Sequence, residues 1–96
     1  MNYIGNAFSL GMVPRELLGQ VRLSPCEAPD VSGLVSCVGH ADTAAVLGVE
    51  MRRVSVTLKP GDVLYVAQLT GGRLPEGTTT LPEGFRFEWV KVEMAA

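Results

Sequence analysis

The sequence predicts an α+β fold, a mixed central β-sheet of about five strands with one or two short helices. Two stretches, residues 54–58 and 85–92, alternate apolar and polar side chains at the period of a strand. Between them, residues 63–69 form a nearly continuous apolar run, while helix-like stretches are few and short. No repeat, charge block or low-complexity linker divides the 96 residues, so we expect one domain over residues 1–96.

Short strands are expected in the first half of the chain. Residues 2–4 and 19–23 are candidates, and residues 34–38 form an apolar run rich in β-branched side chains. A helical turn beginning at Pro14 is expected over residues 13–18. The strands of this half would share the sheet with those of the second half.

The second half is expected to begin with a β-hairpin. Residues 54–58 and 63–69 flank the pair Pro60-Gly61, which is suited to a tight turn. The apolar run of the second strand predicts that it is buried on both faces. Residues 85–92 follow as a further strand and carry three of the six aromatic residues.

The clearest helix signal covers residues 42–47. Asp42 or His40 lies near the N-cap, and Gly48 is placed for a left-handed stop. Two turns are too short to be stable alone, so we expect the helix to pack against the sheet through residues 45–47.

The composition favours a soluble protein of the cytosol. Although 47% of the residues are hydrophobic, no apolar run approaches the ~18 residues of a membrane span, and the first residues lack the basic start of a signal peptide. Cys26 and Cys37 stand apart from any CxxC pair or histidine cluster, so both are expected to be reduced and buried, with no metal site. A chain of this length is expected to be only marginally stable without a partner.

The net charge of −2 argues against a protein that coats long nucleic acid. An anionic ligand must therefore be met by local positive charge. Six of the eight basic residues are arginines, which suit planar, bidentate phosphate contacts: Arg15, Arg22, Arg52, Arg53, Arg73 and Arg86.

Two motifs near the predicted strand ends could bind phosphate. The small side chains of residues 5–9 (Gly-Asn-Ala-Phe-Ser) would let backbone amides approach a ligand, although a strand-to-turn connection needs the same residues. Residues 39–43 place the only histidine, His40, just before a helix whose amino end attracts anions. A phosphodiester there would have a proton donor beside it, but His40 could equally cap the helix.

A third motif, residues 71–77, leaves the predicted buried strand through a flexible diglycine. Arg73 could clamp a phosphate, and Glu76 could orient Arg73 or a ribose hydroxyl. The alternative is a solvent-exposed loop with an incidental ion pair. Arg53, at the start of the predicted hairpin, is a further candidate cation.

Four motifs occur in the same order as in a known family, namely residues 3–12, 39–43, 53–56 and 73–77. On these motifs the chain resembles the viral type III anti-CRISPR ring nucleases, first catalogued as archaeal-virus proteins of unknown function and found also in phages and bacteria. The resemblance runs nearly end to end. Its most specific parts are the Asn-Ala-Phe-Ser turn and the Gly-His pair.

The resemblance implies a two-fold symmetric homodimer that binds cyclic tetra-adenylate, the second messenger of type III CRISPR immunity, and cleaves it without metal or other cofactor. A ribose 2′-hydroxyl would attack the adjacent phosphorus and give linear adenylates that end in a 2′,3′-cyclic phosphate, which counters or switches off this immunity. By position, His40 would be the general acid, Arg73 would stabilise the charge on phosphorus, and Glu76 would support their network. The ligand-binding residues implied are Gly5, Asn6, Ser9, Gly39, Arg53 and Gln68.

The chain departs from the family pattern in two places. The stretch between His40 and Arg53 is about one helical turn shorter, and residues 78–84 are too few for the helix that many members carry there. These differences bear on ring size and cleavage rate more than on the class of ligand. Two alternatives therefore stay open: a protein that sequesters a cyclic oligonucleotide without cutting it, and a structural dimer with no nucleotide ligand.

Overall fold

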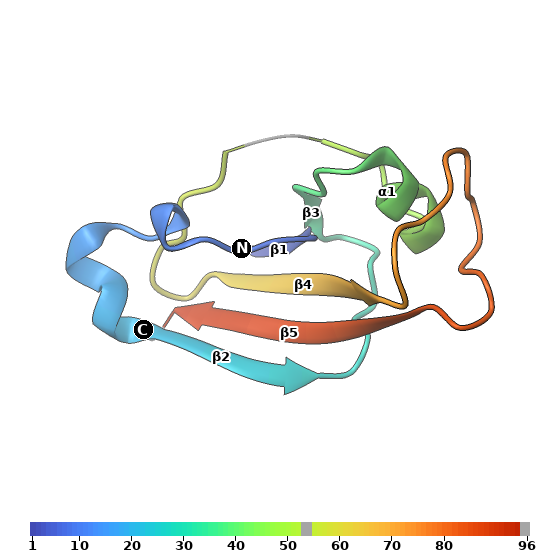
Figure 1. The fold of residues 1–96 in the computed structure, drawn as a ribbon. Helices are drawn as coiled ribbons and strands as arrows, with labels where there is room; N and C mark the ends of the chain where they lie inside the picture. Colours follow the sequence, from blue (N-terminus) through green and yellow to red (C-terminus); the bar gives the residue numbers. More distant parts are fainter. Residues whose placement is uncertain (53–54, 95–96) are drawn as a thin grey trace.

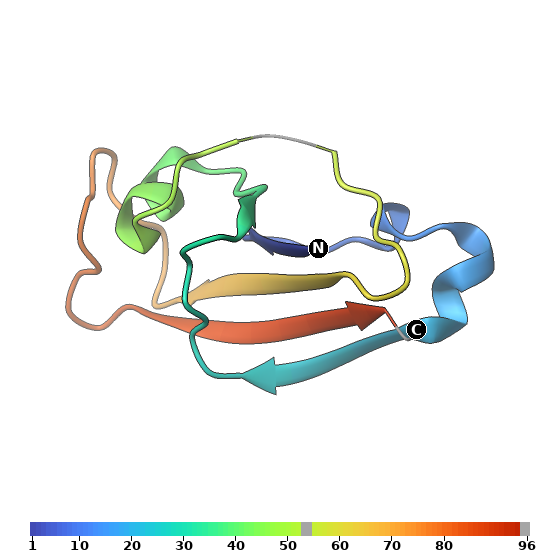
Figure 2. The same ribbon diagram turned by 180° about the vertical axis from the view of Figure 1, so that it is seen from behind.

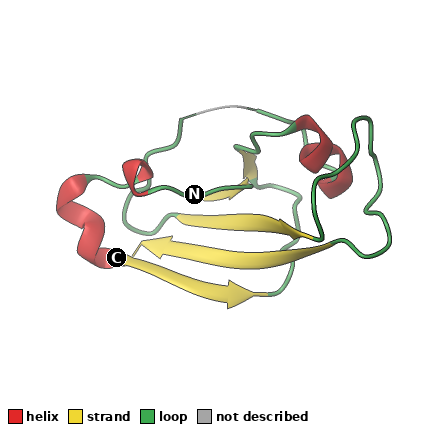
Figure 3. Ribbon diagram, viewed as in Figure 1, coloured by secondary structure: helices red, strands yellow, loops and turns green. Residues whose placement is uncertain are grey.

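The computed structural model describes residues 1–52 and 55–94. Their strands form one five-stranded sheet in the order β2-β5-β4-β1-β3 (Figure 1). The strands are β1 (Asn2–Gly5), β2 (Val21–Cys26), β3 (Val35–Ser36), β4 (Val63–Thr70) and β5 (Arg86–Met94). The helices of the described residues are short, namely the 3-10 helices η1 (Leu10–Met12) and η2 (Arg15–Gln20) and the α-helix α1 (Ala41–Leu47). Figure 3 shows the 3-10 helices at one end of the sheet and α1 at the other.

The sheet is mixed, as expected. β1 runs parallel to both its neighbours, β3 and β4, whereas β5 is antiparallel to β4 and to β2. The α+β class is therefore confirmed. The strands expected at residues 2–4, 19–23 and 34–38 are present with shifted ends, and the helical turn after Pro14 is η2.

The predicted hairpin of residues 54–58 with residues 63–69 is wrong. Its first segment lies partly outside the described residues, and residues 55–59 contain no strand. β4 already pairs with β1 on one edge and with β5 on the other, so no edge is left for this segment. Val56 and Leu58 instead pack in the core, where Leu58 is fully buried, and the N–H of Leu58 donates to the carbonyl oxygen of Met12 at 2.8 Å.

The turn expected at Pro60-Gly61 is confirmed. Gly61 has φ 88°, and the N–H of Asp62 donates to the carbonyl oxygen of Lys59 at 2.9 Å. The Asp62 carboxylate is buried and accepts hydrogen bonds from the Met1 amino group and the Lys59 N–H, both at 3.0 Å. Burial by itself raises the pKa of Asp62, but these hydrogen bonds and the nearby positive charges hold that pKa below its ordinary value.

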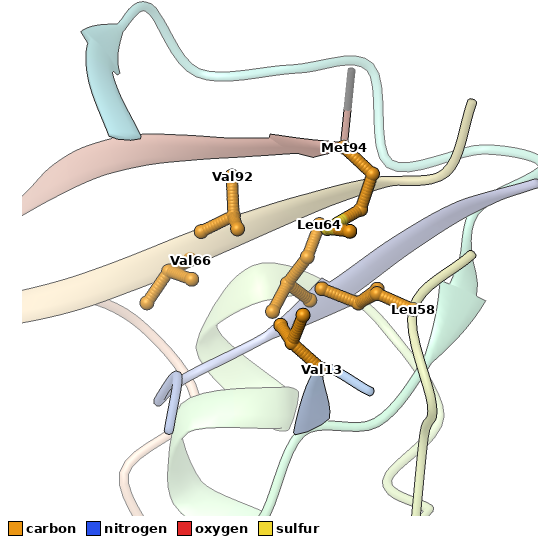
Figure 4. Packing of buried hydrophobic residues seen from close by; sticks show 6 residues of the cluster. All are labelled: Val13, Leu58, Leu64, Val66, Val92 and Met94. Atoms are coloured by element: carbon orange, nitrogen blue, oxygen red, sulfur yellow. The ribbon is translucent and has the colours of Figure 1, made fainter. Parts of the chain in front are cut away.

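The main core lies on one face of the sheet. Six buried side chains pack there (Figure 4): Val13, Leu58, Leu64, Val66, Val92 and Met94. Leu64 and Val66 lie on the same face because alternate side chains of a strand share a face. The next residue, Ala67, points to the other face and is 2% exposed, so the centre of β4 is buried on both faces as predicted.

The buried residues of helix α1 are Thr43 and Ala44, which precede the predicted contact residues 45–47. Ala45 is exposed, so the prediction is wrong at that residue, whereas Val46 and Leu47 are half-buried. Each residue turns an α-helix by about 100°, so a shift of one position moves a side chain from the buried to the exposed side. The glycine stop is confirmed, because Gly48 has φ 72° and its N–H bonds the carbonyls of the last turn.

The two cysteines are free thiols, and each is half-buried rather than buried. The thiol of Cys37 donates to the carbonyl oxygen of Ile4 at 3.2 Å, and burial raises its pKa. Within residues 1–52 and 55–94, no helix has the length and apolar character needed to cross a membrane.

Candidate functional site

Three strands end at one edge of the sheet. Because β3, β1 and β4 run parallel, their carboxyl ends lie together, on the side of α1 in Figure 1. A predicted site residue follows each strand: His40 after β3, Asn6 directly after β1, and Arg73 after β4. In open sheets with parallel strands, ligands bind beyond such carboxyl ends.

A hollow of about 550 Å³ opens at this edge, and we refer to it as the edge hollow. Its volume falls within the range of roughly 300–1,000 Å³ that is typical of small-molecule sites. The predicted residues Asn6, His40 and Arg73, which come from three separate motifs, all contribute to its wall. The full lining comprises Asn6, His40, Asp42, Thr43, Ala67, Leu69, Gly72, Arg73 and Leu74.

Asn6 connects two of the loops that form the edge hollow. Its Oδ1 accepts a hydrogen bond from the N–H of Gly39 at 3.3 Å. Nearby, the N–H of Cys37 donates to the carbonyl oxygen of Ile4 at 2.7 Å. These bonds hold the segment that precedes His40 against the end of β1.

His40 is the N-cap residue of α1, but only through its backbone. Its carbonyl oxygen accepts the N–H of Ala44 at 3.0 Å, whereas its side chain makes no capping hydrogen bond. The alternative interpretation, in which the imidazole caps the helix, is therefore wrong.

Residues 71–85, which we call the β4–β5 loop, lie beside α1 and are drawn in orange in Figure 1 and Figure 2. The loop is closed tightly at its base. Gly71 has φ 110°, and a Cβ atom there would lie 2.7 Å from the carbonyl oxygen of Gly84. Within the loop, the N–H and the hydroxyl of Thr78 both donate to the carbonyl oxygen of Pro75, at 3.1 and 2.5 Å.

Arg73 and Glu76 lie on the β4–β5 loop, and both are exposed. Arg73 lines the edge hollow, whereas Glu76 does not. Among the described residues the two form no ion pair with each other. The loop is connected to α1 by the N–H of Gly77, which donates to Oδ1 of Asp42 at 3.3 Å.

Among the described residues, the other predicted ligand residues lie outside the lining, namely Gly5, Ser9, Gly39 and Gln68. Gly5 is buried in β1, where a Cβ atom would lie 3.0 Å from the sulfur of Cys37, so packing accounts for the glycine. Ser9 is exposed just before η1. Gln68 is exposed and, by strand alternation, points to the opposite face from the lining residues of β4. Arg53 lies outside the described residues.

Sequence reasoning treated Asp42 only as a helix-capping candidate. In the structure its carboxylate lines the edge hollow and bonds the β4–β5 loop. The one available signal was its position, two residues after His40. The apolar part of the lining, which includes Ala67 and Leu69, could not be assigned without the strand alternation of β4.

Two further hollows suit an anion less well. One of about 560 Å³ between β2 and β5 is lined by Glu27 and Glu88 and by no basic residue. Another of about 470 Å³ beside β3 includes Arg52, which lies 3.5 Å from Glu50 in an ion pair and shares the hollow with Asp30. The edge hollow instead presents His40 and Arg73, which forms no ion pair within residues 1–52 and 55–94, and the carboxylate of Asp42 already accepts a hydrogen bond from Gly77.

Comparisons with known proteins agree with this fold. The model of the STIV B116-like family matches residues 2–92. The chain belongs to this family. Among solved structures, B116 of Sulfolobus turreted icosahedral virus (STIV) is similar, with a TM-score of 0.74 and 20% identity over 96% of this chain and 97% of that one. At this identity the likeness shows the fold alone.

The comparison with curated proteins gave no match. Of the resemblance inferred from the sequence motifs, the comparisons show membership of the STIV B116-like family and a likeness in fold to a viral protein. Ring cleavage and the roles of the site residues stay predictions.

Proposed function

We propose that this protein is a metal-independent ring nuclease that binds and cleaves cyclic tetra-adenylate and thereby counters type III CRISPR immunity. One observation carries the proposal: Asn6, His40 and Arg73 follow three parallel strands and line the same hollow. In cleavage of a phosphodiester by an internal hydroxyl, an imidazole can protonate the leaving oxygen, a guanidinium can stabilise charge on the phosphoryl group, and an amide can help to position the ligand. Membership of a viral family is consistent with it.

In the proposed reaction, a ribose 2′-oxygen forms a bond to the adjacent phosphorus while the bond from phosphorus to the 5′-oxygen breaks. The imidazolium of His40 gives its proton to the departing 5′-oxygen, and the 2′-hydroxyl loses its proton to water. Arg73 stabilises the negative charge that develops on the phosphoryl oxygens. Asn6 holds the ring and keeps His40 in place through Gly39.

The proposal includes a homodimer. A ring of four nucleotides is larger than the drug-sized ligands that hollows of about 550 Å³ enclose, so one protomer offers room for part of the ring only. A two-fold axis would bring a second copy of the same hollow to the rest of the ring. Each protomer would then supply one His40, and the pair would act on two bonds of the ring.

Glu76 has a secondary place in the proposal. It is exposed and lies outside the lining. We therefore propose that Glu76 stabilises the β4–β5 loop, or orients a ribose hydroxyl once the ring is bound. Ser9, Gln68 and Arg53 stay candidates for contacts with the parts of the ring that extend beyond the edge hollow.

The test is incubation of the purified protein with cyclic tetra-adenylate in EDTA, followed by chromatography of the products. We expect linear adenylates from the wild-type protein and an intact ring with Arg73→Ala. A ring that stays intact after long incubation with excess wild-type protein would contradict the proposal.

A second candidate function is sequestration of the ring without cleavage. The positions of two carboxylates favour it. Asp42 accepts a hydrogen bond from Gly77 and Glu76 lies outside the edge hollow. Neither carboxylate is therefore available as a general base for cleavage. Sequestration predicts a raised melting temperature with the ring and recovery of the ring unchanged. His40→Ala would then leave the affinity nearly unaltered.

A further inference from the structure

A single hydrogen bond connects the two elements that carry the proposed catalytic groups. The N–H of Gly77, on the β4–β5 loop, donates to Oδ1 of Asp42 at 3.3 Å. Asp42 lies in the first turn of α1, two residues after His40, and Gly77 lies four residues after Arg73. The bond therefore joins the histidine side of the edge hollow to the arginine side.

The β4–β5 loop makes few hydrogen bonds to the rest of the described chain. Its remaining hydrogen bonds among the described residues are internal, from Thr78 to Pro75 and from Phe85 to Pro82. Its base is fixed where Gly71 approaches the backbone of Gly84, and Arg73 lies two residues beyond Gly71 on the way to Gly77. The bond to Asp42 is the hydrogen bond by which residues 71–85 contact another element in the described part of the chain.

Asp42 is negatively charged, so its presence in the lining needs a reason other than contact with a phosphate. A carboxylate in a hollow that receives phosphates repels the ligand, and that repulsion lowers affinity. The side chain is half-buried and accepts the Gly77 N–H, so its position is explained by the loop and not by the ligand. An asparagine could accept the same bond without the repulsion, which gives a direct means of separating the two effects.

We infer that Asp42 is a positioning residue, which holds the β4–β5 loop so that Arg73 faces the same phosphate as His40; this inference rests on the proposed function. Asp42 does not touch the reacting atoms. Its loss leaves both catalytic groups present but frees the loop that carries one of them. The reaction then slows because Arg73 spends less time in place, while the ring itself still binds.

The first test measures the loop without any ligand. Hydrogen exchange of the Gly77 amide, followed by NMR, is expected to be about five-fold faster in Asp42→Ala than in the wild-type protein. Asp42→Asn keeps the acceptor and is expected to exchange at nearly the wild-type rate. Asp30→Ala is the matched control, because it removes one carboxylate whose hydrogen bonds go to Ser32, away from the edge hollow.

The second test measures cleavage of cyclic tetra-adenylate by the same variants. We expect Asp42→Ala to lower kcat about ten-fold with KM unchanged or lower, and Asp42→Asn to restore kcat to within about two-fold. Asp30→Ala is expected to match the wild-type protein. Rescue by asparagine also shows that a loss in Asp42→Ala does not come from misfolding.

Two results would overturn the inference: unaltered Gly77 exchange in Asp42→Ala, or unaltered kcat in that variant when the wild-type protein cleaves the ring. A wild-type protein that leaves the ring intact contradicts the proposed function alone. In that case faster Gly77 exchange in Asp42→Ala still supports the role of Asp42 in holding the loop, and unaltered exchange still overturns it.

Discussion

The side-chain oxygen of Asn6 accepts a hydrogen bond from the backbone N–H of Gly39 at 3.3 Å, which links the end of β1 to the residue before His40. The two residues are 33 positions apart in the chain. Because Asn6 also lines the edge hollow, one side chain both builds the site and contributes to its surface.

Replacement of Asn6 by alanine is therefore expected to lower both stability and cleavage. Loss of the bond to Gly39 should reduce the free energy of unfolding by about 1 kcal/mol. Asn6→Asp keeps an acceptor for Gly39 but places a negative charge beside the proposed phosphate position, so it should retain more stability while binding the ring more weakly. Urea unfolding and ring titration measure the two effects, and equal ring affinity in Asn6→Asp and wild type would argue against a phosphate at this position.

The imidazole of His40 is expected to matter for cleavage and not for folding. Because its side chain makes no capping bond, His40→Ala should alter the free energy of unfolding by less than about 0.5 kcal/mol. If His40 is the general acid, as proposed, its removal should slow single-turnover cleavage by about 10²- to 10⁴-fold. A large loss of stability in this variant, seen by thermal unfolding, would show that the histidine has a structural role instead.

Gly71 is expected to tolerate no side chain. A Cβ atom there would meet the carbonyl oxygen of Gly84 at 2.7 Å, and φ 110° is unfavourable for alanine. Gly71→Ala should cost about 2 kcal/mol in the free energy of unfolding and displace the β4–β5 loop. Gly19→Ala is the matched control, since a Cβ atom at Gly19 meets nothing within 4 Å, and similar costs for the two variants would contradict the account.

The buried Asp62 carboxylate is expected to make stability depend on acid pH. Since its pKa is lower in the folded protein than the ~3.9 of an unfolded chain, its contribution is present above that value and is lost as pH falls through the folded pKa. Asp62→Asn should lower the free energy of unfolding by about 1 kcal/mol at pH 7. Urea unfolding between pH 7 and pH 2 should show this difference shrinking toward acid, and a constant difference would contradict the assignment.

Local pattern predicted the sheet better than it predicted the site. β4 and β5 were predictable because a continuous apolar run and a clear alternation belong to the strands themselves. The alternation of residues 54–58 led to a wrong prediction of a strand, because a local pattern does not show that both edges of β4 are paired with other strands. Whether a strand-like segment pairs or packs is decided by the other strands.

The candidate site was also predictable only in part. His40 and Arg73 could be singled out by residue type and motif, but their meeting at one hollow depends on three strands that run parallel, which no local pattern encodes. The bond between Asp42 and Gly77 spans 35 positions and uses a backbone N–H as donor, so residue identity gave no sign of it.

The central claim is that His40 cleaves a cyclic adenylate within the edge hollow. The most direct measurement is mass spectrometry of the products when excess protein is incubated with cyclic tetra-adenylate in EDTA, with wild type and His40→Ala in parallel. We predict linear adenylates ending in a 2′,3′-cyclic phosphate from the wild-type protein and, at the same incubation time, a ring that is almost wholly intact with the variant. An intact ring in both reactions, or equal cleavage in both, would contradict the account.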